Sequence, residues 1–302
     1  ALLTAVFVLG IGARAATVTN EDDSGAGSLR QAIAGAATGE TIIFSYGKSI
    51  YITLTSPITI DKDIVIDGSG NYDVTISGGQ ATSIFKIASG NVEIKSLTLL
   101  DGLAQGGNGE NNGRLDRHAS GGGGAGMGGA IAVQGGIVLI DGVNFIDNKV
   151  KGGNGGNSTA PVGTTDYAGA GGGSNFGSGG SRNNWGSPYH GTAGGFGGGG
   201  SGGLQYGPSG NGGTGGFGGG GGGGASGAWS HYTTYPTGGS PGQAGLFGGA
   251  GSAGQTMSYK GQGYGFGGGG GGGGGLGGAL FIKSGDVTVS DSTFTGSVAE
   301  GG

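Results

Sequence analysis

Short alternations of apolar and polar residues recur through the first 107 positions of the chain and predict β-strands. Residues 50–54 and 64–66, for example, place an apolar side chain at every second position, which is the pattern of a half-buried strand. Asp, Gly, Ser and Asn fill the positions between the alternating runs, as expected of turns. We expect further strands at 41–44, 58–60 and 74–76.

One stretch, residues 27–37, has helical spacing instead. Leu29, Ile33 and Ala36 would form one apolar face, and Ser28 can cap the first turn. We expect this short helix to cover the open end of the strand-rich part that follows it.

An internal repeat is the strongest pattern in the chain. Residues 128–153 align without a gap with residues 277–302, and residues 83–107 match the same frame except for its first position. Each copy reads as an apolar pair, a turn with Gly, an alternating strand, a polar turn, a second alternating strand and Gly-Gly. A unit of this kind cannot bury its apolar face alone, so copies are expected to stack along one axis.

The repeat predicts an all-β solenoid, a parallel β-helix of about five coils with an N-terminal helical cap. Its domain comprises residues 16–153 and 277–302. If the three copies are equivalent coils, Ile94, Ile140 and Val289 stack in the interior.

Two glycine-rich excursions interrupt the repeats, one at 108–127 and a larger one at 154–276. Both leave after the Gly-Gly that ends one copy and return before the Gly-Gly-Ala that begins the next. Insertions at one position of a repeat emerge on one face of a solenoid. We therefore expect the two excursions to emerge side by side, with the larger one ordered along one side of the β-helix.

Two short motifs in the repeats carry a family resemblance. Gly128–Ile131 (GGAI) with Phe145–Asn148 (FIDN) resembles the paired GGA[ILV] and FxxN signature of polymorphic outer-membrane autotransporter proteins. The last copy repeats the spacing, with Ser297 in place of the Asn. Residues 23–44 also resemble the cap and first strand of many bacterial surface β-helix proteins. The resemblance implies a secreted, right-handed β-helix with adhesive or structural duties.

Glycine makes up 89 of the 302 residues, and it is concentrated in the larger excursion, where only Asp166, Arg182 and Lys260 are charged. Such a segment can form a disordered linker, because ordering Gly costs the most backbone entropy. Its dispersed aromatic residues and three-residue glycine patterns favour instead an ordered bundle of polyglycine II-like helices. The alternation of glycine tracts and aromatic loops resembles, in composition, the tips of certain phage tail adhesins.

The candidate contact residues are the large aromatic side chains of the loops between glycine tracts. Trp and Tyr provide large contact areas at small entropic cost. The alternative is that these rings pack inward and cover the glycine helices. The candidates are Trp185, Tyr189, Trp229, Tyr232 and Tyr235.

The polar residues indicate no reaction. The net charge of −5 and the scattered Lys and Arg argue against nucleic acid as a partner. The chain has no Cys, and no group of residues has the spacing of a metal or cofactor site. Asp61, Asp63 and Asp67 flank a strand and are expected at corners, and the cluster 114–118 is expected to be a solvated or salt-bridged loop. We therefore expect a protein that is not an enzyme, with a polysaccharide-active β-helix enzyme as the weakest alternative.

The N-terminal apolar run, residues 1–15, is either the remnant of a secretory signal or a retained segment, and it is too short for a transmembrane helix. It indicates a secreted, extracellular protein. Two functions remain open: a self-assembling structural protein, such as a filament or sheath subunit, or an adhesin that binds a cell-surface glycan or protein receptor.

Overall fold

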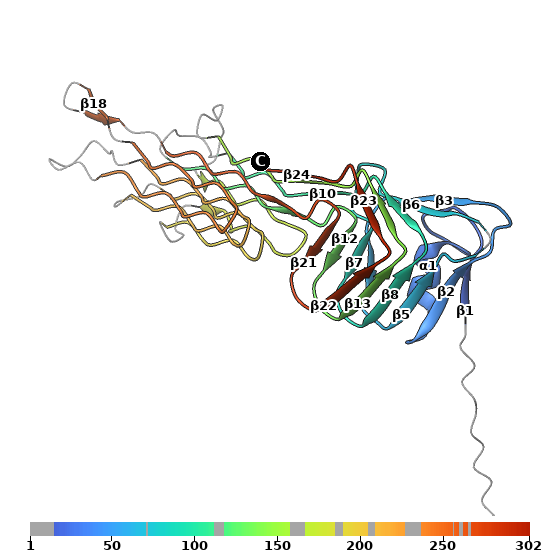
Figure 1. Ribbon diagram of the computed structural model, residues 1–302. Helices are drawn as coiled ribbons and strands as arrows, with labels where there is room; N and C mark the ends of the chain where they lie inside the picture. Colours follow the sequence, from blue (N-terminus) through green and yellow to red (C-terminus); the bar gives the residue numbers. More distant parts are fainter. Residues whose placement is uncertain are drawn as a thin grey trace, which may run out of the picture.

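The computed structural model is rich in β-strands, with parallel sheets and one helix among the residues that it describes (Figure 1). These residues are 15–70, 72–111, 118–157, 167–184, 190–204, 209–226, 237–255, 257–259, 262–264 and 267–302. The predicted N-terminal segment 1–15 therefore lies outside the described residues except for Ala15, the first residue of β1.

The chain passes through several sheets in turn and returns to the first, so that successive passes add parallel strands to the same sheets. The largest sheet has the spatial order β1 (Ala15–Val18), β2 (Glu40–Phe44), β5 (Ile64–Asp67), β8 (Asn91–Lys95), β13 (Ile137–Asp141) and β22 (Asp286–Ser290). Sequence order and spatial order agree along this sheet, as stacking of successive turns requires.

In the other sheets, too, the spatial order of the strands follows their order in the sequence. The second contains β3 (Ile50–Thr53), β6 (Val74–Ser77), β9 (Thr98–Leu100), β14 (Asn144–Ile146) and β23 (Thr293–Thr295). The third contains β4 (Ile58–Ile60), β7 (Phe85–Ile87), β12 (Ile131–Val133) and β21 (Leu280–Ile282). A shorter sheet joins β10 (Leu103–Gln105), β15 (Lys149–Lys151) and β24 (Val298–Glu300). The upstream strands predicted from alternation thus lie within two residues of their expected bounds.

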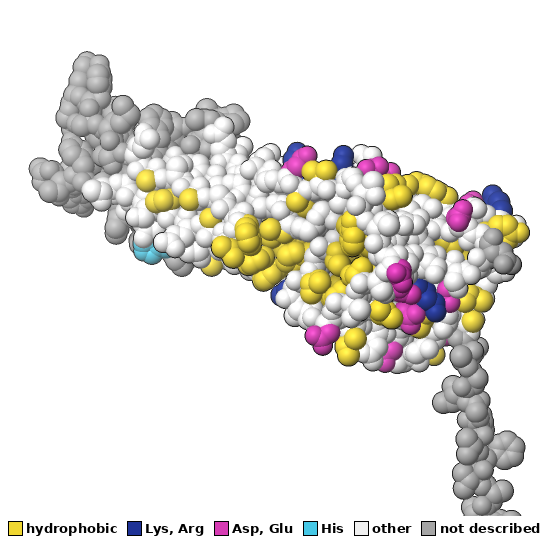
Figure 2. All heavy atoms as spheres, in the orientation of Figure 1, with side chains coloured by type: hydrophobic (Ala, Val, Ile, Leu, Met, Phe, Trp, Pro, Cys, Tyr) yellow, Lys and Arg dark blue, Asp and Glu magenta, His cyan; other side chains and the backbone are white. Residues whose placement is uncertain are grey.

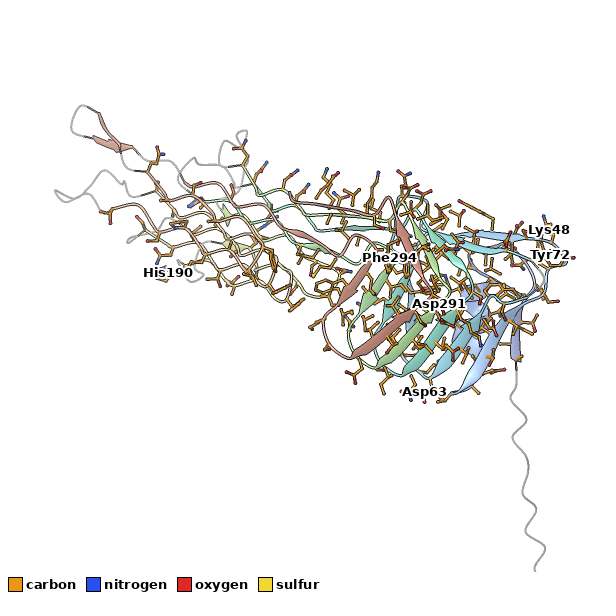
Figure 3. All side chains as sticks on the ribbon, viewed as in Figure 1. Lys48, Asp63, Tyr72, His190, Asp291 and Phe294 are labelled. Carbon is orange, nitrogen blue, oxygen red and sulfur yellow. The ribbon has the colours of Figure 1, made fainter. Side chains whose placement is uncertain are left out.

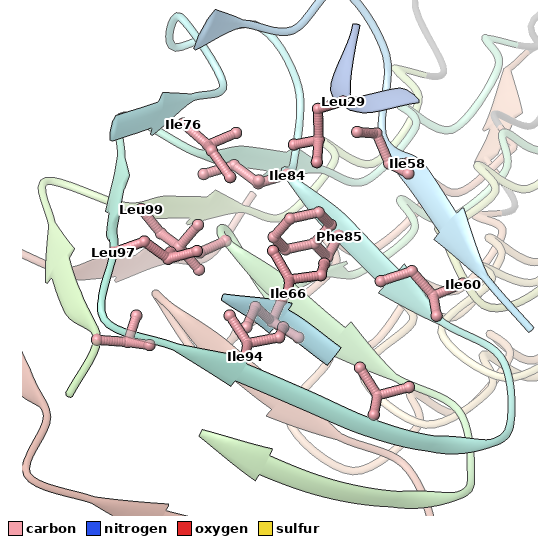
Figure 4. Packing of buried hydrophobic residues seen from close by; sticks show 14 of the residues in the cluster. Leu29, Ile58, Ile60, Ile66, Ile76, Ile84, Phe85, Ile94, Leu97 and Leu99 are labelled. Atoms are coloured by element: carbon pink, nitrogen blue, oxygen red, sulfur yellow. The ribbon is translucent and has the colours of Figure 1, made fainter. Parts of the chain in front are cut away.

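The three repeat copies are in the expected register. Ile140 pairs with Ile94 on one side and with Val289 on the other. Ile94 and Ile140 are fully buried in an apolar interior built from inward-facing Ile, Leu, Val and Phe side chains (Figure 4). Val289 was also expected to be buried, but it is 41% exposed. An inward-facing side chain is covered only when a further turn stacks on it, and among the described residues none stacks on the turn of β22.

The corners between strands are built by residues in the left-handed region. Equivalent positions of the three copies share this conformation: Gly90, Gly136 and Gly285 have φ of 99°, 96° and 102°. At another corner Ser96 and Asp291 have φ of 55° and 45°. Gly and short polar residues adopt positive φ at the least cost, which explains the polar turns of the repeat.

The helix α1 (Leu29–Gly35) has the N-cap residue and the apolar face that the sequence predicts. The Ser28 side chain accepts a hydrogen bond from the Gln31 N–H, and Leu29, Ile33 and Ala36 are buried against the first turns. Arg30 donates to Asp23 Oδ1 in the loop before the helix at 2.6 Å and to the Ser56 carbonyl after β3 at 2.7 Å, which joins the helix to both.

The two excursions form one body, here called the glycine region, which comprises the described residues within 106–126 and 152–276. It begins beside β10 and β15, at the pair β11 (Gly126–Met127) and β20 (Gly275–Leu276), and extends away from the sheets (Figure 1). The expectation that it lies along one side of the sheets is therefore wrong. Its extended segments bond to one another, whereas the outer sheet faces offer side chains and no free backbone groups.

Candidate contact surfaces

The sequence placed the contact surface at Trp185, Tyr189, Trp229, Tyr232 and Tyr235, and all five lie outside the described residues. One described residue next to them, His190, can be placed. His190, which follows the first loop, lies in the part of the glycine region remote from the sheets (Figure 3). We call this the far end of the glycine region. Two short antiparallel pairs also occur in this region: β16 (Tyr167–Ala168) with β17 (Asn183–Asn184), and β18 (Met257–Tyr259) with β19 (Gln262–Tyr264).

The glycine region is held together by backbone hydrogen bonds between extended segments. Its central segment, residues 118–126, donates to three neighbouring segments in strict rotation. Ala119, Gly122 and Ala125 donate to 203, 200 and 197, while Ser120, Gly123 and Gly126 donate to 268, 271 and 274. Gly121 and Gly124 donate to 110 and 107. The segments 152–157, 169–173 and 220–223 in turn donate to its carbonyls. The central segment is thus surrounded on all sides and buried throughout.

This packing requires glycine in the interior. A Cβ at Gly122 would lie 2.2 Å from the Gly220 carbonyl oxygen, and one at Gly123 would lie 1.8 Å from the Gly153 oxygen. Backbone segments so close leave no room for a methyl group. The composition of the excursion is therefore a steric requirement of the bonding pattern.

Side chains take up backbone N–H groups at several edges of the glycine region. Asn108 Oδ1 accepts from Asn154 N at 2.9 Å, and Asn111 Oδ1 accepts from Asn157 N at 2.7 Å. Glu110 accepts from Ala170 N and also pairs with Arg182, whose Nε donates to it at 2.9 Å. These edges cannot readily bond to a further extended segment, because their donors are already used.

The outermost pair of segments, residues 237–255, has a different character, and we call it the outer layer. It contains no charged residue. Gln243, Ala250 and Ala253 are exposed, and their N–H groups have no hydrogen-bond partner among the described residues. The outer layer is therefore an uncharged edge with free backbone donors.

A cluster of phenylalanine rings lies where the glycine region joins the sheets, and the sequence analysis missed it. We call this cluster the phenylalanine row. Its rings come from turns between successive glycine segments and from β21, and neighbouring ring centroids are 5.0–5.9 Å apart. Its members are Phe176, Phe196, Phe217, Phe247 and Phe281. The available signal was the repeated Phe-Gly doublet at 196–197 and 217–218.

The phenylalanine row is covered by a lysine at its middle ring, Phe196, and is open at its Phe247 end. Lys283 Nζ lies 4.9 Å from the centroid of the Phe196 ring, a cation–π contact. At the open end, Phe247 and its neighbour Leu246 are 62% and 66% exposed. Hydrophobic side chains gather at this junction on the face seen in Figure 2.

The outer face of the largest sheet carries a shallow groove of about 310 Å³, and its carboxylates already have partners. Asp63 accepts from Asn91 N at 2.7 Å, and Glu93 lies 3.4 Å from Lys95 Nζ. Lys95 also pairs with Asp67 at 3.3 Å. Partial burial acts to raise the pKa of Asp67, but hydrogen bonds from Ser69 and the charge of Lys95 hold it below its usual value. Asp63 directly precedes β5 and Asp67 is its last residue, so both lie at corners as expected.

The histidines and acidic residues of the described part of the chain do not form a further site. His190 Nδ1 accepts from Asn211 N at 3.0 Å. Within the described part of the chain, no three His, Asp or Glu side chains are grouped as a metal site would need. Of the 114–118 cluster, only His118 is described, and it is buried at the start of the central segment.

No helix in the described ranges is long and apolar enough to span a membrane. No protein-family model matches the chain, and no curated protein and no solved structure matches it.

Proposed function

We propose that the chain is a secreted, non-enzymatic surface protein in which a right-handed parallel β-helix carries a projecting polyglycine II-like bundle. The in-register parallel ladders of the repeat copies support the β-helix. The three-residue rotation of the hydrogen bonds supports the bundle, since a threefold extended helix aims every third N–H at the same neighbour.

The proposed activity is binding of a cell-surface glycan or protein by the far end of the bundle, as in an adhesin. One observation carries this proposal: His190, the described residue that follows the loop of Trp185 and Tyr189, is remote from the sheets (Figure 3). A bundle with a hydrogen-bonded interior is a rigid support, and rigid supports present binding loops at low entropic cost. Aromatic residues in such loops are the residue types that dominate contact energies.

The double variant Trp185→Ser with Trp229→Ser tests this activity. Binding is measured on arrays of cell-surface glycans and of immobilised cell-surface proteins, and thermal unfolding is measured in parallel. Tyr51→Ser with Tyr72→Ser is the matched control, because Tyr51 on β3 and Tyr72 shortly before β6 are both about half exposed. We expect the tryptophan variant to lose binding by about tenfold or more with an unchanged Tm, and the control to keep it.

A large fall in Tm of the tryptophan variant would show that the rings cover the bundle, and the contact proposal would then fail. Self-association is a second candidate function, as for a filament or sheath subunit. The outer layer favours it, because this uncharged edge has free backbone donors.

A further inference from the structure

We infer that the outer layer, residues 237–255, is the surface on which a second copy of this chain docks, with the same layer of each copy in contact. This inference rests on the self-association proposed above and is independent of what the far end binds. Three features of the layer carry it: its free hydrogen-bond donors, its lack of charge and its exposed end of the phenylalanine row.

One N–H of the outer layer is capped by a side chain, since Ser240 N donates to Asn211 Oδ1 at 2.9 Å, but other donors of this layer are left open. Inner N–H groups of this layer bond to the next segment, as Gly242 does to Gly222 and Gly245 to Gly219. The outward N–H groups of Gln243, Ala250 and Ala253 have no partner in the described part of the chain. At other edges Asn108, Asn111 and Glu110 supply side-chain acceptors to such donors.

The occupant must offer an extended backbone with no bulky or charged side chains. The outer layer of a second copy meets this requirement, and it can do so in either orientation. The central segment already bonds to one neighbour with rising residue numbers, 268 to 274, and to another with falling numbers, 203 to 197. A contact between identical surfaces is isologous and closes at two copies.

The turn that joins the two segments of the outer layer differs from the equivalent turns of the glycine region in a way that fits this contact. Gly197 and Gly218 have φ of 76° and 77° after a Phe, whereas Phe247, with φ of 69°, occupies the corresponding place after Leu246. A left-handed residue with a bulky side chain is strained by about 1–2 kcal/mol. Here the strain places a ring in solvent, 62% exposed, where the phenylalanine row of a second copy can continue it.

The size of the layer sets the expected affinity. Eight or nine residues at about 3.1 Å per residue give segments about 25 Å long, and the layer is two segments wide. Such a contact lies at the small end of specific interfaces, so we expect a dimer with a Kd in the range of about 1–100 µM.

Sedimentation of the full chain from about 1 to about 200 µM tests the inference, because this range brackets the expected Kd. We expect a concentration-dependent dimer. Phe247→Gly and Ala253→Lys should each weaken dimerisation by about tenfold or more, through loss of the ring and through facing ammonium groups. Ala193→Lys, at an exposed position in a different segment, is the control and should dimerise normally.

The Tm of each variant separates a contact effect from misfolding, and Phe247→Gly should not lower it because Gly occupies this place in the other turns. A wild-type chain that stays monomeric throughout the range overturns the inference, as does a dimer that persists in Ala253→Lys. Because the glycan and protein arrays report the far-end contact separately, loss of binding with an intact dimer would count against the adhesin proposal alone.

Discussion

Replacing one buried glycine of the central segment by alanine should destabilise the whole glycine region. In Gly122→Ala the new Cβ would lie 2.2 Å from the Gly220 carbonyl oxygen and 2.8 Å from the Gly221 oxygen. These are backbone atoms, so no side chain can rotate out of the way. An ordinary carbon–oxygen contact is near 3.4 Å, and the neighbouring segment must therefore move by about 1 Å.

The size of the effect follows from what this movement breaks. Overpacking by one methyl group costs about 1–3 kcal/mol in a well-packed interior. The displacement also strains hydrogen bonds of the moving segment, from Gly220 N to Gly123 O at 2.8 Å and from Gly200 N to Gly220 O at 2.9 Å, at about 1 kcal/mol each. We expect a loss of about 3–5 kcal/mol in the local stability of the glycine region.

Gly269→Ala is the matched control, because its Cβ would meet nothing closer than 3.5 Å. At such a position alanine is neutral or stabilising by about 0.4–1 kcal/mol. Amide exchange of peptides from residues 118–126, measured by mass spectrometry, reports the local stability. Exchange should rise by about 100-fold or more in Gly122→Ala and stay unchanged in the control. Equal protection in both variants would refute the close-packed arrangement.

Three other predictions concern the sheets. Ile140→Asp should unfold the chain, because it puts an unpaired charge into the dry interior. Leu139→Asp, on the outer face, is the control and should lower the free energy of unfolding by less than about 1 kcal/mol. Denaturant titration measures both variants. Asn148→Ala should lower the free energy of unfolding by about 2–3 kcal/mol in the same assay, because it removes the hydrogen bonds that the Asn148 side chain makes with the buried Gly102 N–H and with the Leu99 carbonyl. Asn144→Ala, at an exposed position, is the control and should lower it by less than about 0.5 kcal/mol.

The last of the three concerns the stability of the fold at low pH. Burial acts to raise the pKa of Asp23, but hydrogen bonds from Thr55 and Arg30 and the Arg30 charge hold it below its usual 3.8. A carboxyl with a lowered pKa stabilises the fold fully above that usual value and loses this effect as the pH falls through the lower folded pKa. Asp23→Asn should therefore reduce stability at pH 7, by about 1–2 kcal/mol, and flatten its decline below pH 4; an unchanged acid profile would contradict this.

The strands and the helix cap could be predicted because they depend on neighbours in sequence. Alternation fixed which side chain of β8 or β13 faces inward, and the gapless repeat fixed the pairing of Ile94 with Ile140. The FxxN motif also has a local physical basis. Asn148 is fully buried, accepts from Gly102 N at 2.8 Å and donates to Leu99 O at 2.9 Å, which joins consecutive turns.

Features that depend on the assembled surroundings could not be predicted. The exposure of Val289 depends on whether another turn covers it, which alternation does not report. The rings of the phenylalanine row are 20 or more residues apart, and no periodic pattern links the turns that bring them together. The direction of the glycine region follows from bonds among its own segments, whose partners a run of glycines does not specify.

The two excursions depend on each other, although the sequence separates them by a complete repeat. The central segment belongs to the shorter excursion, and segments of the longer one pack around it and bond to it. Without this segment, the segments at 197–203, 220–223 and 268–274 lose a common neighbour and expose backbone groups that glycine cannot shield.

Glycine also loses more entropy on ordering than any other residue, so the remaining bonds must offset a large cost. We therefore expect a peptide of residues 154–276 to be unfolded in isolation, although its described residues are hydrogen-bonded to neighbouring segments in the full chain. Amide exchange and limited proteolysis of the peptide and of the full chain make the comparison. Addition of a peptide of residues 106–127 should restore some protection if the shorter excursion supplies the missing centre. Strong protection in the isolated peptide would show that the longer excursion orders itself, and the central role of residues 118–126 would then be wrong.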